Sequence, residues 1–243
     1  MSLTYAPPAT SAGAPGTEPT RRVPAGDISN RAAGLGALGF AGVVVLQNIL
    51  RASAPQPGAD LDDVVRHFAD HRALTVTLTA TFVVGLCSLA LFIGGTLRRL
   101  AATDRRGWAV LGAFGACTLV ALFAGVLASE QALSVVAVGK APDMGAVQAL
   151  WNLHNSVFTV NLLFIGIALV GLSRAGIAAD ITPRPFRVLA PVGAGLLTVG
   201  TLSGPYIANG EAMPLFGVSV IGFVVWLAFL ATTGRRLIRS EAA

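Results

Sequence analysis

Six long apolar segments dominate this sequence and restrict the folds open to it. They cover residues 32–50, 74–97, 108–128, 151–173, 188–207 and 214–233. A helix needs about 20 residues to cross the hydrocarbon core of a bilayer, and inside that core its backbone has to satisfy its own hydrogen bonds. The sequence therefore predicts an all-α fold: a polytopic membrane helical bundle of six transmembrane helices within residues 31–240.

The composition favours the same fold class. Hydrophobic residues make up 54% of the 243 residues and charged residues only 12%, whereas soluble domains carry about 25% charged residues. A net charge of +5 would fit nucleic-acid binding in a soluble protein. Here the basic residues flank apolar segments, so we interpret them as topology signals and lipid-headgroup contacts. We expect the lipid bilayer as a partner and no nucleic acid.

The positions of the basic residues predict an orientation. Thirteen of the seventeen lie before the first apolar segment, in the connections around 98–106 and 174–187, or after the last segment. The other connections hold only Arg51, Arg66, Arg72 and Lys140. The positive-inside rule then places both termini in the cytoplasm of a multi-pass plasma (inner) membrane protein. Residues 1–30, rich in Pro, Ala, Gly, Ser and Thr, are predicted to be a disordered cytoplasmic tail.

The chain aligns with itself at an offset of 83 residues. Phe40 to Val43 falls on an identical Phe123 to Val126, and Gln47-Asn48 falls on Glu130-Gln131. The same register pairs Asp60 with Asp143, Val64 with Val147, Phe68 with Trp151, and His71 with His154. We therefore predict that the bundle arose from duplicated helical hairpins, with parallel repeats.

Residues 60–72 are predicted to form an external amphipathic helix. Their apolar residues recur at helical spacing, and Asp63, His67 and His71 follow at intervals of four, so these three share one side. Such a stripe can ligate a divalent metal. It can equally be the solvated side of a helix lying at the interface, which we favour for His67.

Polar residues at the outer ends of the segments define a candidate site. His154 and its repeat partner His71 match in depth, and Glu130 and Gln47 lie nearby along their helices. Polar groups at membrane depth are costly and usually face a cavity or a partner. We take His71, His154, Glu130 and His67 as candidate metal ligands, and His71 and His154 as candidate cofactor ligands. The candidate polar cavity comprises Gln47, Asn48, Gln131, Asn161 and Tyr206.

Three functions stay open. The protein is structural or binds a partner, either another membrane protein or a second copy of itself. Alternatively, an outward-facing site built on His71 and His154 binds a metal, a haem or a small ligand. As a third alternative it transports a small solute, although no acidic or basic residue lies deep in any segment. No G-x-S-x-G, H-E-x-x-H or P-loop motif occurs, so nothing specific predicts an enzyme. The cofactor, divalent metal or haem, is not determined by these residues.

Two motifs point to a family resemblance. One is the segment from Pro55 to His71, with the pattern P-x-x-G-A-D-x-x-x-V followed by F-x-x-H, and the other is W-N-x-H-N, which starts at Trp151. The chain resembles the uncharacterised six-span membrane proteins common in actinobacteria, over residues 31–240. Its heavy use of Arg, Ala and Gly is typical of a GC-rich bacterial genome. The resemblance implies the six-span architecture and no particular activity.

Overall fold

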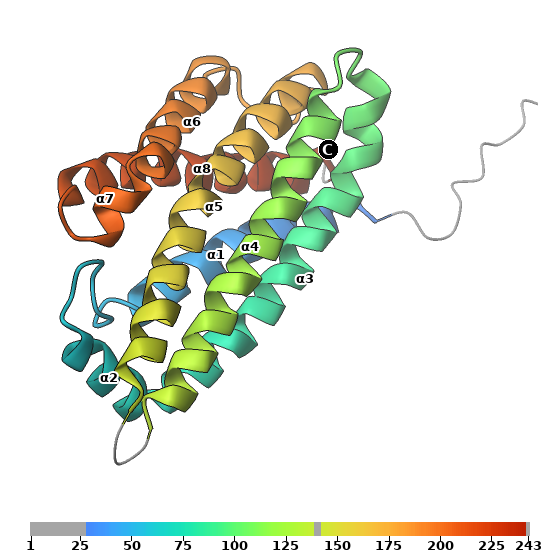
Figure 1. Ribbon diagram of the computed structural model, residues 1–243. Helices are drawn as coiled ribbons and strands as arrows, with labels where there is room; N and C mark the ends of the chain where they lie inside the picture. Colours follow the sequence, from blue (N-terminus) through green and yellow to red (C-terminus); the bar gives the residue numbers. More distant parts are fainter. Residues whose placement is uncertain (1–27, 139–141, 242–243) are drawn as a thin grey trace, which may run out of the picture.

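All the secondary structure in the described residues is α-helical (Figure 1). The structure, a computed structural model, describes residues 28–138 and 142–241. The predicted tail therefore lies almost entirely outside the described residues, as does Lys140. The helices are α1 (Asn30–Leu50), α2 (Leu61–Asp70), α3 (Arg72–Thr103), α4 (Trp108–Val136), α5 (Met144–Ala178), α6 (Phe186–Leu202), α7 (Gly204–Ala208) and α8 (Met213–Glu241).

The lengths and surfaces of the helices are those of a membrane bundle. Five of the described helices, α1, α3, α4, α5 and α8, are long and apolar enough to cross a bilayer, and α6 is a shorter apolar helix of 17 residues. Large apolar side chains stand exposed along them, such as Val76, Val110 and Ile221. In water this much apolar surface would drive association, whereas acyl chains accommodate it. The chain is a multi-span helical membrane protein.

The helices extend beyond the predicted apolar segments. The fourth segment was predicted to begin at residue 151, but α5 begins at Met144 with the carboxylate of Asp143 accepting hydrogen bonds from two backbone amides of its first turn. The third segment was predicted to end at residue 128, but α4 continues to Val136. Hydropathy marks only the part of a helix that suits hydrocarbon, while the backbone stays helical into the interface.

The fifth predicted segment, 188–207, is not one continuous helix. α6 ends at Leu202, and the separate short helix α7 starts at Gly204. Pro205 lies in the first turn of α7, where its missing N–H is tolerated, but within a continuing helix it would break the hydrogen-bond ladder. The prediction of six full-length spans is therefore corrected to five long apolar helices and the shorter apolar helix α6, which the short helix α7 follows.

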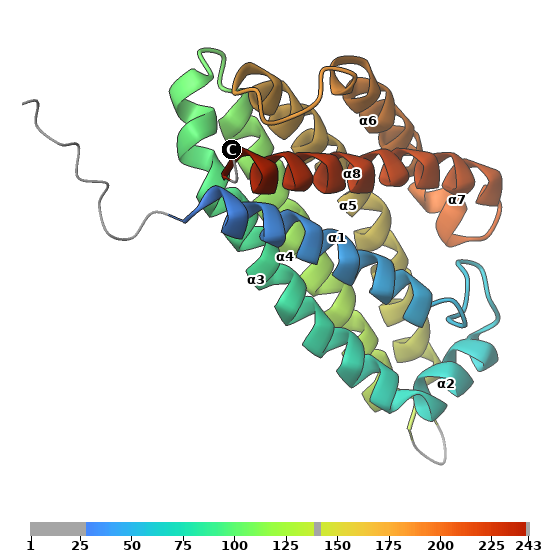
Figure 2. The same cartoon turned by 180° about the vertical axis from the view of Figure 1, so that it is seen from behind.

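The six apolar helices form a closed ring. Each helix of the ring packs on the next: α1 on α8, α8 on α6, α6 on α5, α5 on α4, α4 on α3, and α3 on α1. α1 lies beside α8 and also packs along α3, and α8 crosses the group of α3, α4 and α5 at a large angle (Figure 2). The main apolar core lies inside this ring and includes Phe92, Leu169, Trp226 and Phe229.

One end of the bundle, the arginine-rich end, gathers the start of α1 and the ends of α3, α5 and α8. The backbone N–H of Arg31 donates to the carboxylate of Glu241. The guanidinium of Arg99 donates to the carbonyl oxygen of Ala179 at 3.3 Å. Arg236 forms an exposed ion pair with Asp180 at 3.6 Å. This arrangement brings arginines from distant parts of the sequence to one end.

The opposite end, the α2 end, is covered by the amphipathic helix. Val64 and Phe68 of α2 are buried against Leu133, Val147 and Trp151 in a second, smaller apolar cluster. The predicted helix 60–72 is shorter than expected, because α2 ends at Asp70 and His71 alone separates it from α3. The chain bends there so that the apolar side of α2 can turn onto α4 and α5.

A loop contact closes the same end. Gly58, in the connection between α1 and α2, lies against Gly210, in the turn between α7 and α8. Both residues have positive φ, of 81° and 78°, which glycine adopts without strain. A Cβ on Gly58 would stand 2.7 Å from the Cα of Gly210, so no other residue fits this contact without movement.

Facing glycines bring α4 and α5 together near the arginine-rich end. A Cβ added to Gly112 would lie 2.5 Å from the backbone nitrogen of Leu172, and one added to Gly171 would meet the backbone of Gly112. Small residues at such a crossing let two helices approach closely and gain van der Waals contact. No side chain can be accommodated there without separating the helices.

We expect Gly112→Ala and Gly171→Ala each to lower the free energy of unfolding by about 1–3 kcal/mol, the usual effect of overpacking a tight contact. The measurement is denaturant unfolding in mixed micelles, followed by helical circular dichroism. Gly195→Ala in α6 is the matched control, because a Cβ there meets nothing within 4 Å. Equal losses in all three variants would contradict the close α4–α5 crossing.

Candidate functional site

An ion pair inside the bundle joins α1 to α4. Arg51, the residue directly after α1, donates from Nε to Oε1 of Glu130 at 3.0 Å and from Nη2 to Oε2 at 3.0 Å. The Glu130 side chain is 6% exposed and that of Arg51 is 21% exposed. The guanidinium also lies over the ring of Phe123, 5.5 Å from its centroid. Two parallel hydrogen bonds and a cation–π contact make this a geometrically specific pair.

Gln47 connects the ion pair to α3. It lies one helical turn before Arg51, and its Oε1 accepts a long contact of 3.5 Å from Nη1 of Arg51. Its Nε2 donates at 3.0 Å to the carbonyl oxygen of Leu78 and to the hydroxyl of Thr81. The buried amide of Gln47 is thus satisfied on both sides, and it orients the guanidinium relative to α3.

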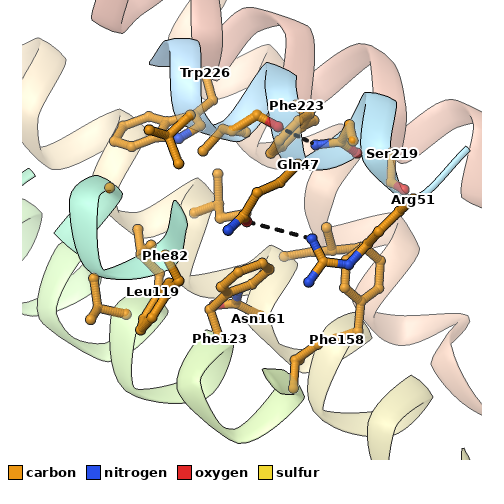
Figure 3. Close-up of a pocket in the computed structure, with 18 of the residues that line it drawn as sticks. Gln47, Arg51, Phe82, Leu119, Phe123, Phe158, Asn161, Ser219, Phe223 and Trp226 are labelled. Atoms are coloured by element: carbon orange, nitrogen blue, oxygen red, sulfur yellow. Dashed lines mark hydrogen bonds between the residues drawn. The ribbon is translucent and has the colours of Figure 1, made fainter. Parts of the chain in front are cut away.

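A cavity of about 180 Å³ adjoins these groups (Figure 3). Side chains of α1, α3, α4, α5 and α8 surround it, so it lies within the ring of helices. Its wall is mainly apolar and unusually rich in rings. The aromatic side chains in the wall are Phe40, Phe82, Phe123, Phe158, Phe216, Phe223 and Trp226.

A few polar groups interrupt the apolar wall. Arg51 and Gln47 contribute from α1, Asn161 and His154 from α5, and Ser219 from α8. Asn161 is 3% exposed, and its Oδ1 has no hydrogen-bond partner among the described residues. A buried amide oxygen without a partner is costly, so it marks a place where a further hydrogen-bonding group would be stabilised.

His154 takes part in the wall and stacks on a neighbouring ring. Its ring stacks on Trp151, with centroids 5.0 Å apart and 10° between the planes. Its Nδ1 lies 3.5 Å from the hydroxyl of Ser129. The neighbouring Glu130 carboxylate is already held by Arg51. The aromatic stack and the long contact with Ser129 therefore both help to hold the His154 ring.

The structure does not bring His71 and His154 together. His71 is exposed and stacks on His67, with ring centroids 4.7 Å apart, and its Nδ1 lies 3.0 Å from the carbonyl oxygen of His67. The repeat partners Phe68 and Trp151 do contact each other, with centroids 6.3 Å apart. The two histidines thus belong to separate side-chain groups, and the paired bis-histidine site stays a prediction from the repeat.

The four candidate metal ligands likewise do not form one cluster. His67 and His71 lie on the outside of the α2 end, whereas Glu130 and His154 lie within the bundle beside Arg51. In residues 28–138 and 142–241, no group of three or more His, Cys, Asp or Glu side chains is placed to hold a metal ion. Metal binding by these residues stays a prediction from their spacing.

The candidate polar-cavity residues divide into two groups. Gln47, Asn48 and Asn161 line the cavity. Gln131 instead faces outward on α4 and donates to the hydroxyl of Thr79 at 2.9 Å, and Tyr206 is 60% exposed on α7. A shift of one position on a helix rotates a side chain by about 100°, so neighbours such as Glu130 and Gln131 point to different surroundings.

Arg51 and the aromatic wall were not among the candidates. Arg51 was interpreted only as one of the few basic residues on the outer side. Its position four residues after Gln47 places both on one side of α1, and this spacing was the available signal. The aromatic residues come from five helices, and which of them share one space is not readable from any single segment.

Comparisons of the chain with protein-family models, curated proteins and solved structures give no significant match.

Removing one partner of the Arg51–Glu130 pair should destabilise the fold. Arg51→Met leaves the carboxylate of Glu130 buried without its cation, and we expect a loss of about 3 kcal/mol, at the lower end for buried pairs because Arg51 is partly exposed. The double variant Arg51→Met/Glu130→Met should recover most of this loss, since no unpaired charge remains. Denaturant unfolding in mixed micelles measures both.

The matched control for these variants is the exposed ion pair of Arg66 with Asp63, whose side chains are 70% and 57% exposed. Arg66→Met should change the unfolding free energy by less than about 1 kcal/mol. A loss for Arg51→Met no larger than that of Arg66→Met would show that the inner pair is solvated like the outer one.

The α2 end should respond to acid through His67. Burial lowers the pKa of His67 below its ordinary value of 6.5, the nearby charge of His71 lowers it further, and Glu130 acts in the opposite direction. The unfolded chain then binds this proton more readily than the folded one. The folded state is therefore most stable, as far as His67 is concerned, above the pKa that His67 has in the unfolded chain. Its stability decreases as the pH falls below that pKa.

We expect the melting temperature of the native chain to fall between about pH 7.5 and about pH 5.5 by more than that of His67→Gln. Thermal unfolding at both pH values measures the difference. Comparing the native chain with the variant removes the contributions of the other groups that titrate in this pH range, because both proteins contain them. An equal or larger fall in His67→Gln would show that protonation of His67 does not oppose the packing of α2.

Proposed function

We propose that this protein binds a small, mainly apolar molecule in the cavity between α1, α3, α4, α5 and α8. One observation carries the proposal: an aromatic-walled space of about 180 Å³ whose wall includes Asn161, a buried residue with an unpartnered amide oxygen. An engineered apolar cavity of about 150 Å³ is large enough to take up benzene. Binding sites are typically concave and mostly apolar, with a few placed polar groups, which describes this wall.

The position of the cavity supports access from the membrane surface. Its polar wall lies at the α2 end, where Arg51 is partly exposed and Asn48 is exposed. We place this end outside a plasma membrane, with both termini in the cytoplasm. Support comes from the arginine-rich end, because the positive-inside rule assigns such an end to the cytoplasm. A molecule that partitions into the outer interface would then meet the polar wall first.

The predicted duplication is consistent with a shared cavity. Phe40 and Val43 of the first copy and Phe123 and Val126 of the second, equivalent under the 83-residue offset, all line it. The residues that precede α2 and α5, Asp60 and Asp143, are equivalent as well. Under this duplication the site lies between the two copies, where repeat-built membrane proteins commonly bind their ligands.

The experiment uses fluorobenzene as a probe and the protein in lipid nanodiscs, with fluorine NMR detecting the bound state by line broadening. Val44, which lines the cavity, is replaced by Trp to fill it, and the adjacent Val45, which is 44% exposed on the outer surface, is replaced by Trp as a matched control. We expect binding to the native chain and to Val45→Trp, and its loss in Val44→Trp.

The contrary outcome is equal broadening for all three proteins and for empty nanodiscs. Fluorobenzene would then only dissolve in the bilayer, and the cavity would be a packing defect in a structural or partner-binding protein. Circular dichroism and melting of Val44→Trp show whether the variant retains its fold, so loss of binding is scored only for folded protein.

A further inference from the structure

The groups in the cavity wall restrict the class of ligand that the cavity can bind, and this inference rests on the proposed function. We infer that the site selects an uncharged, ring-sized molecule that carries one hydroxyl or amide group. The ring matches the aromatic wall, the hydrogen-bonding group matches Asn161 and Arg51, and the absence of charge follows from the Arg51–Glu130 pair.

The wall favours a flat ring. Seven aromatic side chains from five helices face this space, and Phe82 and Phe123 lie 5.6 Å apart between ring centroids. Aromatic groups pack in offset or edge-to-face arrangements that add about 0.5–1.5 kcal/mol to the burial of apolar area. A ring inserted among these side chains finds such partners on several sides (Figure 3).

Among the described residues, the wall offers one unpartnered buried amide oxygen and one available cationic donor. The Oδ1 of Asn161 is unpartnered among the described residues and accepts a hydrogen bond from a hydroxyl or an N–H. On Arg51, Nε and Nη2 are held by Glu130, while Nη1 makes only the 3.5 Å contact with Gln47. Nη1 can therefore donate to an oxygen without breaking the ion pair.

The charge balance excludes an ionised ligand. Arg51 is the one Arg or Lys that the described residues contribute to the wall, and Glu130 neutralises it with two hydrogen bonds. A carboxylate ligand would add a second negative charge next to Glu130, and the single guanidinium of Arg51 cannot neutralise both buried carboxylates. An ammonium ligand would lose its hydration next to a guanidinium without gaining a free counter-ion.

Three fluorinated probes test this class of ligand in the same experiment, with the protein in lipid nanodiscs and fluorine NMR as the measurement. Fluorobenzene has the ring alone, 4-fluorophenol adds a neutral hydroxyl, and 4-fluorobenzoate carries a negative charge. Cavity binding of each is the part of the signal that Val44→Trp removes. We expect 4-fluorophenol to bind more tightly than fluorobenzene, and 4-fluorobenzoate to show no cavity binding.

Asn161→Leu supplies the decisive comparison. We expect it to reduce the ratio of 4-fluorophenol affinity to fluorobenzene affinity by about 3- to 10-fold, the effect of losing one hydrogen bond. Asn152→Leu, an exposed position on the same helix, should leave the ratio unchanged. Because the ratio is taken within one protein, partition of the probes into lipid and small changes of fold cancel, and retained fluorobenzene binding shows that Asn161→Leu is folded.

The outcomes separate the two proposals. Cavity binding of none of the probes overturns the proposed function. Cavity binding of fluorobenzene with an unchanged ratio in Asn161→Leu, or with 4-fluorobenzoate binding as tightly as 4-fluorophenol, keeps the binding function but overturns the ligand class.

Discussion

The architecture of this bundle depends on how two opposite charges are kept inside an apolar protein. A carboxylate surrounded by hydrocarbon is strongly unfavourable unless a cation and hydrogen bonds compensate it. Glu130 receives two hydrogen bonds from Arg51, and the guanidinium in turn lies over Phe123 and contacts Gln47. Through Gln47 the network reaches α3, so the charges determine how α1, α3 and α4 are placed relative to one another at the α2 end.

The two ends of the bundle are packed by different means. Near the arginine-rich end, glycines face each other between α4 and α5 and, at Gly34 and Gly234, between α1 and α8. These contacts bring backbones together and leave no space for side chains. Nearer the α2 end, bulky rings from five helices surround the cavity and do not fill the centre completely. The cavity is therefore a consequence of where small and large residues stand along the helices.

The amphipathic helix α2 shows how a local pattern acquires a tertiary role. Its apolar side was readable from the spacing of Val64 and Phe68, and the structure buries this side against Leu133 and Trp151. The spacing of its histidines equally predicted a metal-binding side. In the structure the rings of His67 and His71 stack on each other, whereas His154 stacks on Trp151. Spacing on one helix determines which residues share a side, but not what faces that side.

The sequence by itself determined the class of the protein, because apolar segments of bilayer length can satisfy their backbone hydrogen bonds only as helices. It also placed the amphipathic helix and the polar character of Gln47, Asn161 and Glu130. Only the tertiary structure decided that Arg51 pairs with Glu130, that α6 stops short of Pro205, and that His71 and His154 lie apart. These outcomes depend on the rotation and crossing of helices distant in sequence. Apolar periodicity carries little information on either, because lipid and protein interior accept the same side chains.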